Sequence, residues 1–74
     1  MNITVKLFAT LRDGRFEKEI RQYPEGTTIG QLIDLLGLPP EKVSIIFKNN
    51  RHANLEDQIM ENDVVAFFPP IGGG

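Results

Sequence analysis

One segment of this chain has the pattern of an amphipathic helix, and helix-limiting residues mark both of its ends. Four apolar side chains recur at the spacing of one helical face: Ile29, Leu32, Ile33 and Leu36. Thr27 or Thr28 can cap the N-terminus, because a threonine oxygen accepts a hydrogen bond from the first helical turn. Gly37 can adopt the left-handed conformation that ends a helix, and Pro39-Pro40 prevents continuation. One main helix of about ten residues is therefore expected.

The N-terminal part of the chain is expected to form two antiparallel strands. Asn2–Phe8 alternates apolar and polar residues with a period of two, which is typical of a strand with one buried face. Asp13-Gly14 is a turn dipeptide. Beyond this turn, Phe16, Lys18 and Ile20 share one face of a second strand that pairs with the first as a hairpin.

The second half of the chain contains two β-prone runs, Val43–Phe47 and Val64–Phe68. The first is expected to be a buried central strand, and the second is stopped by Pro69-Pro70. The segments between them are expected as turns at Asn49-Asn50 and Glu61–Asp63, a short edge strand at Arg51–Asn54 and a single helical turn at Leu55–Ile59.

The expected order of elements is strand, strand, helix, strand, short strand and strand. A single helix can cover one face of a mixed sheet of four to five strands, so an α+β roll is expected. An SH3-like or OB-like barrel is the alternative fold, and the capped central helix argues against it. The 74 residues are too few for two separate cores. Because the chain has no cysteine, a hydrophobic core has to stabilise this one domain.

Composition disfavours several classes of function. Without cysteine there is no thiolate zinc site, and the single histidine, His52, lies in a polar stretch typical of exposed side chains, so no metal site is expected. A net charge of −2 lacks the positive balance that favours nucleic-acid binding. No apolar run is long enough for a membrane span, and no signal peptide is recognised. We therefore expect a cytoplasmic protein that binds neither nucleic acid nor membrane.

No residue pattern indicates an enzyme with its own catalytic side chains. Ser44 is the only serine, and it lies in a β-prone stretch without a nucleophile-elbow motif. Gly26–Gly30 resembles an anion-binding loop at a helix start, but it lacks the lysine and the spacing of a Walker A motif. A plain turn followed by a helix cap is the preferred interpretation.

Acidic residues gather near the C-terminus: Glu56, Asp57, Glu61 and Asp63. No Lys or Arg follows Arg51, so charge is unevenly distributed along the chain. Two interpretations stay open. The acidic residues are either a solvated face that keeps the protein soluble or a docking rim for a basic groove on a partner protein.

The C-terminal segment from Phe67 to Gly74 contains no polar or charged side chain. Pro69-Pro70 stiffens the exit from the last strand, and the three terminal glycines have no Cβ, so they can enter a channel too narrow for other residues. Six extended residues from Pro69 span roughly 20 Å at about 3.3 Å each. The only reactive group at that reach is the α-carboxylate of Gly74. A frayed terminus or a linker is the alternative interpretation.

The ending Val65–Gly74 combines a Phe-Phe-Pro-Pro stem with a terminal diglycine. It resembles the ending of the MoaD/ThiS family of ubiquitin-like sulfur carriers, and most closely that of MoaD proteins, the small subunits of molybdopterin synthase. Val5–Arg12, Thr28–Leu36 and the turn Glu61–Asp63 are similar as well, so the resemblance covers essentially the whole chain. ThiS-type carriers end in a similar diglycine without this stem.

The resemblance implies a β-grasp (ubiquitin-like) domain over residues 1–68 and a flexible carrier tail over residues 69–74. In this family an adenylating enzyme activates the terminal glycine with ATP, and sulfur then replaces AMP to leave a thiocarboxylate. Gly74 would be the reacting residue, and Gly72 and Gly73 would thread the partner's active site. The stem that docks against the partner would comprise Phe67, Phe68, Pro69, Pro70 and Ile71. The acidic residues would line the rim of this interface.

The implied partners are an adenylating enzyme related to ubiquitin-activating enzymes, the large subunit of molybdopterin synthase and a sulfur donor protein. Because the adenylating enzyme would hold the ATP, this chain would bind no cofactor and would act as a substrate and sulfur donor, not as an enzyme. Three alternatives remain. They are a ThiS-type carrier for thiamine thiazole synthesis, a ubiquitin-like modifier joined to target lysines through Gly74, and a passive β-grasp interaction domain.

Overall fold

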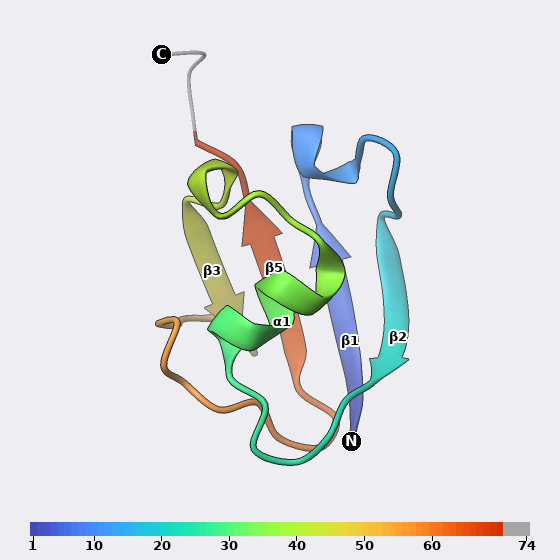
Figure 1. Ribbon diagram of the computed structural model, residues 1–74, viewed down its shortest axis with the longest axis vertical. Helices are drawn as coiled ribbons and strands as arrows, with labels where there is room; N and C mark the ends of the chain where they lie inside the picture. Colours follow the sequence, from blue (N-terminus) through green and yellow to red (C-terminus); the bar gives the residue numbers. More distant parts are fainter. Residues whose placement is uncertain (71–74) are drawn as a thin grey trace.

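A computed structural model describes residues 1–70 as a mixed five-stranded sheet crossed on one face by a helix (Figure 1). The strands are β1 (Asn2–Leu7), β2 (Lys18–Gln22), β3 (Ile45–Lys48), β4 (Arg51–His52) and β5 (Val64–Phe68), and the helix is α1 (Ile29–Leu36). Two short 3-10 helices, η1 (Ala9–Arg12) and η2 (Pro40–Lys42), lie in the connections. The sheet order is β2-β1-β5-β3-β4, and β1 and β5 are parallel while the other pairs are antiparallel. The predicted α+β roll with one main helix is confirmed.

Both ends of α1 are set by the local residues that predicted them. Thr28 is the cap: its side-chain oxygen accepts from the Gln31 backbone N–H at 3.2 Å, and its own N–H donates to the Gln31 side chain at 2.9 Å. Thr27 is instead buried, and its hydroxyl donates to the Pro24 carbonyl at 2.7 Å. Gly37 ends the helix with a φ of 71°, in the left-handed region that favours glycine.

The core fills the space between α1 and the covered face of the sheet. Odd-numbered residues of β1 and β5 face the helix and are fully buried: Ile3, Val5, Leu7, Val65 and Phe67. Ile29, Leu32 and Ile33 pack against them from α1. Since neighbouring strand residues point to opposite faces, the even-numbered residues of β1 and β5 face the side without a helix, which we call the open face.

The predicted antiparallel partner of β1 exists as β2, but it begins later than expected and does not include Phe16. The chain bends at Glu17, and β2 starts only at Lys18. Ile20 lies opposite Thr4 on the open face, where it is 70% exposed. Phe16 precedes the strand and packs against the core from the sheet edge, with the Arg21 guanidinium 4.7 Å above its ring. The grouping of Phe16 with Ile20 on one face is therefore wrong, because the bend breaks the alternation between them.

The predicted helical turn at Leu55–Ile59 is wrong, because the backbone of this segment forms hydrogen bonds with the residues around the start of α1. The carbonyls of Leu55 and Asp57 accept hydrogen bonds from the N–H groups of Gly30 and Ile29, both at 2.9 Å. The Ile59 N–H donates to the Thr27 carbonyl at 2.9 Å, and the Ile59 side chain is fully buried. When the backbone groups of a segment form hydrogen bonds with another segment in this way, they are not available for helical hydrogen bonds within the segment.

The predicted strands at Val43–Phe47 and Arg51–Asn54 exist with different bounds. The first is β3, which begins at Ile45, and all four of its residues are half-buried because one of its faces lies on the open side. Its expected full burial is wrong, since β1 and β5 hold the centre of the sheet. The second is β4, which is only two residues long.

Candidate functional site: the end of β5 and the open face

The last strand of the sheet is held by backbone hydrogen bonds on both sides up to its final residue. The Phe67 carbonyl accepts from the Phe8 N–H at 3.2 Å, and the Phe68 carbonyl accepts from the Ser44 N–H at 2.8 Å. Pro69 and Pro70 follow, and neither has an N–H to continue the pairing. The chain therefore leaves a central strand of the sheet at one defined point, Phe68.

Four ring side chains form a continuous stripe on the open face at this point. Phe8 and Phe68 stack with ring centroids 4.3 Å apart, Phe47 meets Phe68 edge-on at 5.6 Å, and the His52 ring lies 4.6 Å from Phe47. Phe8, Phe47 and Phe68 are half-buried and His52 is exposed. We call these residues the aromatic stripe. A contiguous aromatic surface of this kind is typical of a protein interaction site.

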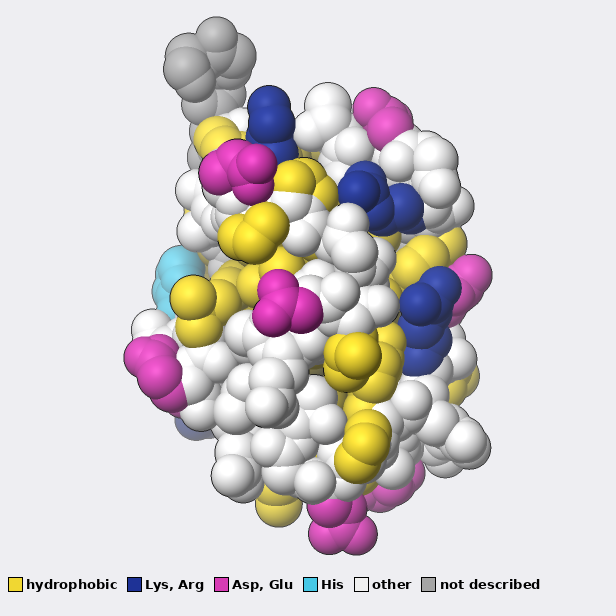
Figure 2. All heavy atoms as spheres, viewed as in Figure 1, with side chains coloured by type: hydrophobic (Ala, Val, Ile, Leu, Met, Phe, Trp, Pro, Cys, Tyr) yellow, Lys and Arg dark blue, Asp and Glu magenta, His cyan; other side chains and the backbone are white. Residues whose placement is uncertain are grey.

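The side covered by α1 offers no comparable surface. Figure 2 shows this side, where hydrophobic side chains occur in separate patches interrupted by acidic and uncharged ones. Leu35 and Leu55 are exposed there by 60% and 54%. The aromatic stripe on the opposite side is therefore the candidate docking surface, because it is contiguous and includes the residue from which the C-terminal tail departs.

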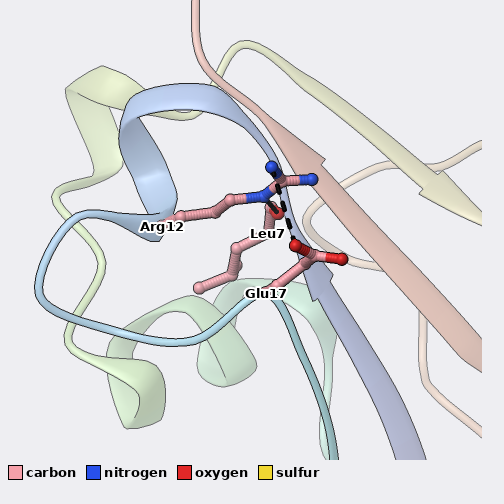
Figure 3. A network of polar contacts seen from close by, with 3 residues as sticks. All are labelled: Leu7, Arg12 and Glu17. Carbon is pink, nitrogen blue, oxygen red and sulfur yellow. Dashed lines mark hydrogen bonds and ion pairs between the residues drawn. The ribbon is translucent and has the colours of Figure 1, made fainter.

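Arg12 is anchored beside the aromatic stripe by three contacts, and Figure 3 shows the two that it makes with Leu7 and Glu17. Its Nε donates to the Leu7 carbonyl at 2.7 Å, its guanidinium carbon lies 5.4 Å from the centre of the Phe8 ring, and Nη1 lies 3.8 Å from a Glu17 carboxylate oxygen. Lys6 and Lys18 line a shallow hollow beside Phe8 and Arg12, which has a volume of about 240 Å³. We call Lys6, Arg12 and Lys18 the cationic flank.

The placement of Phe67 in the docking stem is wrong. Its side chain is fully buried beneath α1, because odd-numbered positions of β5 face the helix. Phe68 points to the open face and remains a candidate contact, together with the half-buried Pro69 and the exposed Pro70. The predicted contacts Ile71, Gly72 and Gly73, and the reacting residue Gly74, lie outside the described residues.

The predicted acidic rim does not surround the exit of the tail. Glu61 and Asp63 precede β5, whereas the tail follows it, so the length of the strand, roughly 16 Å for five residues, separates them. Glu56 and Asp57 lie in the loop that contacts the start of α1. The hollow beside Phe8 is lined instead by three basic side chains and by Glu17, which is not one of the predicted rim residues.

Asp63 has a structural role that excludes it from a rim. It is 8% exposed, and its carboxylate accepts hydrogen bonds from the Asn49 side-chain amide and the Met60 N–H, both at 2.8 Å. Asn49 in turn accepts from the Val64 N–H at 2.9 Å. This network ties the β3–β4 turn to the first residue of β5.

The residues predicted from the sequence to form a site did not include Phe8, Phe47 or the cationic flank. A signal for the first was present. Phe8 follows Thr4 and Lys6 at the polar positions of an alternating strand, and an aromatic side chain there indicates a surface contact, whereas Phe68 ends an apolar run that does not alternate. Their approach to Phe47 could not be foreseen, because it depends on the pairing of β5 with both β1 and β3.

Residues 1–70 contain neither a metal-binding cluster nor a membrane-spanning helix. No group of three or more His, Asp and Glu side chains in this part of the chain is placed to hold a metal ion. α1 has eight residues, and none of the described helices is long and apolar enough to cross a membrane.

The model of the ThiS family matches residues 5–74, nearly the whole length of the chain. This chain belongs to the ThiS family. A comparison with curated proteins found no match. The family assignment and the sheet topology agree with the MoaD/ThiS resemblance of the C-terminal stem and with its implied β-grasp fold.

Solved structures share the fold of this ThiS-family chain over its full length. SAMP1 from Haloferax volcanii has a TM-score of 0.78 at 24% identity, with 100% of both chains covered. A Pyrococcus furiosus protein assigned as molybdopterin converting factor subunit 1 has a TM-score of 0.77 at 25% identity, with 96% of this chain and 99% of that one covered. A complex of subunits 1 and 2 of molybdopterin-converting factor from Helicobacter pylori 26695 matches with a TM-score of 0.67 at 22% identity, with complete coverage of both chains. These matches confirm the β-grasp fold.

Proposed function

We propose that this protein is a sulfur carrier whose C-terminal Gly74 is adenylated and converted to a thiocarboxylate that donates sulfur in molybdopterin biosynthesis. The observation that carries the proposal is the end of β5. The strand is held on both sides to Phe68 and is followed at once by Pro69-Pro70, beside an exposed aromatic stripe. A rigid base next to a docking surface would position the terminal carboxylate in a partner's active site.

The chemistry requires an activated carboxyl group, because resonance and negative charge make a carboxylate a poor electrophile. In the proposed reaction a Gly74 carboxylate oxygen attacks the α-phosphorus of ATP, and pyrophosphate leaves. A hydrosulfide ion supplied by the sulfur donor protein then attacks the acyl carbon, AMP leaves with the electron pair of the C–O bond, and loss of the S–H proton gives the thiocarboxylate. The adenylating partner would bind the ATP, so this chain would act as a substrate and sulfur donor and not as an enzyme.

The proposed partners are the adenylating enzyme, a sulfur donor protein and the large subunit of molybdopterin synthase. The names of two similar structures, the Pyrococcus furiosus and Helicobacter pylori proteins, support the molybdopterin pathway. The latter structure holds subunit 1 in complex with subunit 2. A ThiS-type role in thiazole synthesis is the alternative within the same chemistry, and the family assignment supports it.

A second candidate function is a ubiquitin-like modifier joined to target lysines through Gly74. The specific observation that favours it is the similarity to SAMP1, which is described as a small archaeal modifier protein. Both functions begin with adenylation of the terminal carboxylate and differ in what attacks the acyl-adenylate. A passive interaction domain, the third candidate, would not be adenylated at all.

The test uses protein with its native C-terminus and the adenylating enzyme from the same organism. ATP–pyrophosphate exchange measures adenylation, and intact-protein mass spectrometry after addition of a sulfur donor measures replacement of one oxygen by sulfur. We expect both signals from the wild type and neither from a variant lacking Gly74. Gln22→Ala, an exposed substitution on β2, serves as the matched control and should behave as the wild type.

Each outcome selects one candidate. Isopeptide-linked adducts without a sulfur-for-oxygen change would support the modifier, and absence of exchange with the wild type would support the passive domain. Persistence of the sulfur-for-oxygen change without Gly74 would overturn the proposed site. Reconstitution of the thiocarboxylated protein with the molybdopterin synthase large subunit, compared with a thiazole-forming system, would identify the pathway.

A further inference from the structure

We propose that the cationic flank selects the adenylating partner by ion pairing with carboxylates that border the partner's apolar docking patch. This inference rests on the proposed function, since it names the chemistry by which the same docking site recognises its partner. It concerns side chains of β1, β2 and η1, not the C-terminal tail. The partner surface that fits is therefore both apolar and acidic.

The strand residues of the open face carry only basic charge although the whole chain has a net charge of −2; the acidic Glu17 lies just before β2. The strand register places only uncharged, basic and histidine side chains on this face, and no Asp or Glu occupies an open-face position of any described strand. Glu19 pairs with Val5 and so belongs to the opposite face. A face with one sign of charge attracts a partner of the other sign and speeds their encounter.

The cationic flank lies beside the part of the aromatic stripe closest to the tail. Lys6 is two residues before Phe8 on the same face of β1, and Lys18 lies directly opposite Lys6 on β2. Within residues 1–70 neither lysine forms an ion pair. Arg12 is held in place by the Leu7 carbonyl and the Phe8 ring, so its guanidinium loses little conformational freedom when a partner binds.

The position of this flank points to the adenylating partner. An enzyme that receives the tail has to approach the end of β5, and there it meets Phe8, Phe68 and the cations beside them. The ion pair between Arg12 and the adjacent Glu17 is long, at 3.8 Å, and 74% of the Glu17 side chain is exposed. A partner carboxylate can therefore approach the guanidinium without first breaking a buried pair.

Two substitutions separate recognition from stability. Lys18→Glu replaces the like-charge pair with Lys6 by an attractive one. Arg51→Glu does the same to the pair that Arg51 forms with Lys48, on the other face and at the far edge of the sheet. Both variants change the net charge equally. Both should raise Tm by about 2–6 °C, because like charges directly opposite each other destabilise a sheet.

Only Lys18→Glu should weaken partner recognition. In ATP–pyrophosphate exchange at low ionic strength we expect its KM to rise about tenfold or more with kcat unchanged, and the rise should shrink below about threefold in high salt. Arg51→Glu should keep the wild-type KM. A lysine present only for solubility would raise Tm on substitution without changing KM.

The outcomes are distinguishable. Exchange with equal KM for the wild type and Lys18→Glu would overturn this inference and leave the proposed function standing. No exchange with the wild type would overturn both. A third outcome is that the wild type binds a single-stranded oligouridylate, that Lys18→Glu does not bind it, and that the two proteins have the same KM in the exchange assay. In that case the face recognises nucleic acid and the inference is wrong.

Discussion

Replacing Asp63 by alanine should destabilise the fold without affecting partner binding by the folded protein. The carboxylate is 8% exposed and accepts two hydrogen bonds of 2.8 Å, from the Met60 N–H and the Asn49 side chain. Asp63→Ala removes both acceptors at once. It also loosens Asn49, whose oxygen accepts from the first amide of β5.

The cost follows from the two donors that lose their partner. A hydrogen bond to a charged acceptor contributes about 1.5–3 kcal/mol, and partial hydration of the loop after substitution reduces the sum to about 3 kcal/mol. A domain of this length has a total stability of about 4–11 kcal/mol. With a urea m-value of about 1 kcal/mol per M, the unfolding midpoint should fall by about 2–3 M.

Urea titration followed by circular dichroism measures this change. Glu56→Ala is the matched control, since it also removes one carboxylate but from an exposed side chain, and its free energy of unfolding should stay within about 0.5 kcal/mol of the wild type. The KM of folded Asp63→Ala in ATP–pyrophosphate exchange should equal that of the wild type. A midpoint within about 0.5 M of the wild type, or a raised KM at unchanged stability, would refute the structural role.

Two further substitutions test the aromatic stripe and the edge of the core. Phe8→Ala removes the ring stacked on Phe68 and should raise the KM for adenylation about tenfold at unchanged kcat. Leu35→Ala, on the outer side of α1, is the control and should leave KM unchanged. Equal KM values for the two variants would contradict docking on the aromatic stripe. Burial raises the pKa of the Tyr23 hydroxyl, against a smaller opposing effect of Arg21, and the buried oxygen has no hydrogen-bond partner within residues 1–70. The folded state therefore favours the neutral phenol, so this contribution to stability is complete below the unfolded-state pKa of about 10 and is lost as pH rises above it. Tyr23→Phe should reduce that alkaline loss in pH-dependent urea titrations and leave stability at pH 7 equal or up to about 1 kcal/mol higher; a destabilised variant at pH 7 would show that the hydroxyl is satisfied.

Elements with strong local signals were predictable from the sequence. α1 forms where the apolar spacing, the Thr28–Gln31 capping box and the positive φ of Gly37 coincide, and each of these acts within a few residues. The same holds for β1, whose alternation fixes the buried face, whereas β5 was predictable as a strand but its uniformly apolar residues do not indicate which face is buried. The C-terminal stem and diglycine were also readable, because they are linear patterns that need no fold to be recognised.

Two of the wrong predictions depend on contacts between distant segments, and a third depends on a bend in the chain. Leu55–Ile59 forms no helical turn because its carbonyls accept from the first amides of α1. Asp63 is buried because Asn49, fourteen residues earlier in the chain, donates to its carboxylate. Ile20 and Phe16 separate because the chain bends before the edge strand. None of these contacts has a local pattern.

The sequence by itself determined the helix, the central strands and the linear C-terminal motif, because hydrophobic periodicity, capping and chain stiffness are properties of neighbouring residues. Only the tertiary structure decided which side chains surround the start of that motif. Parallel pairing of β1 with β5 and antiparallel pairing of β5 with β3 bring Phe8, Phe47 and Phe68 together on the open face. The hairpin of β1 and β2 sets Lys6 and Lys18 beside them, while Phe67 is turned into the core. Register assigns each residue to a face of the sheet, and register is a property of strands that are far apart in the chain.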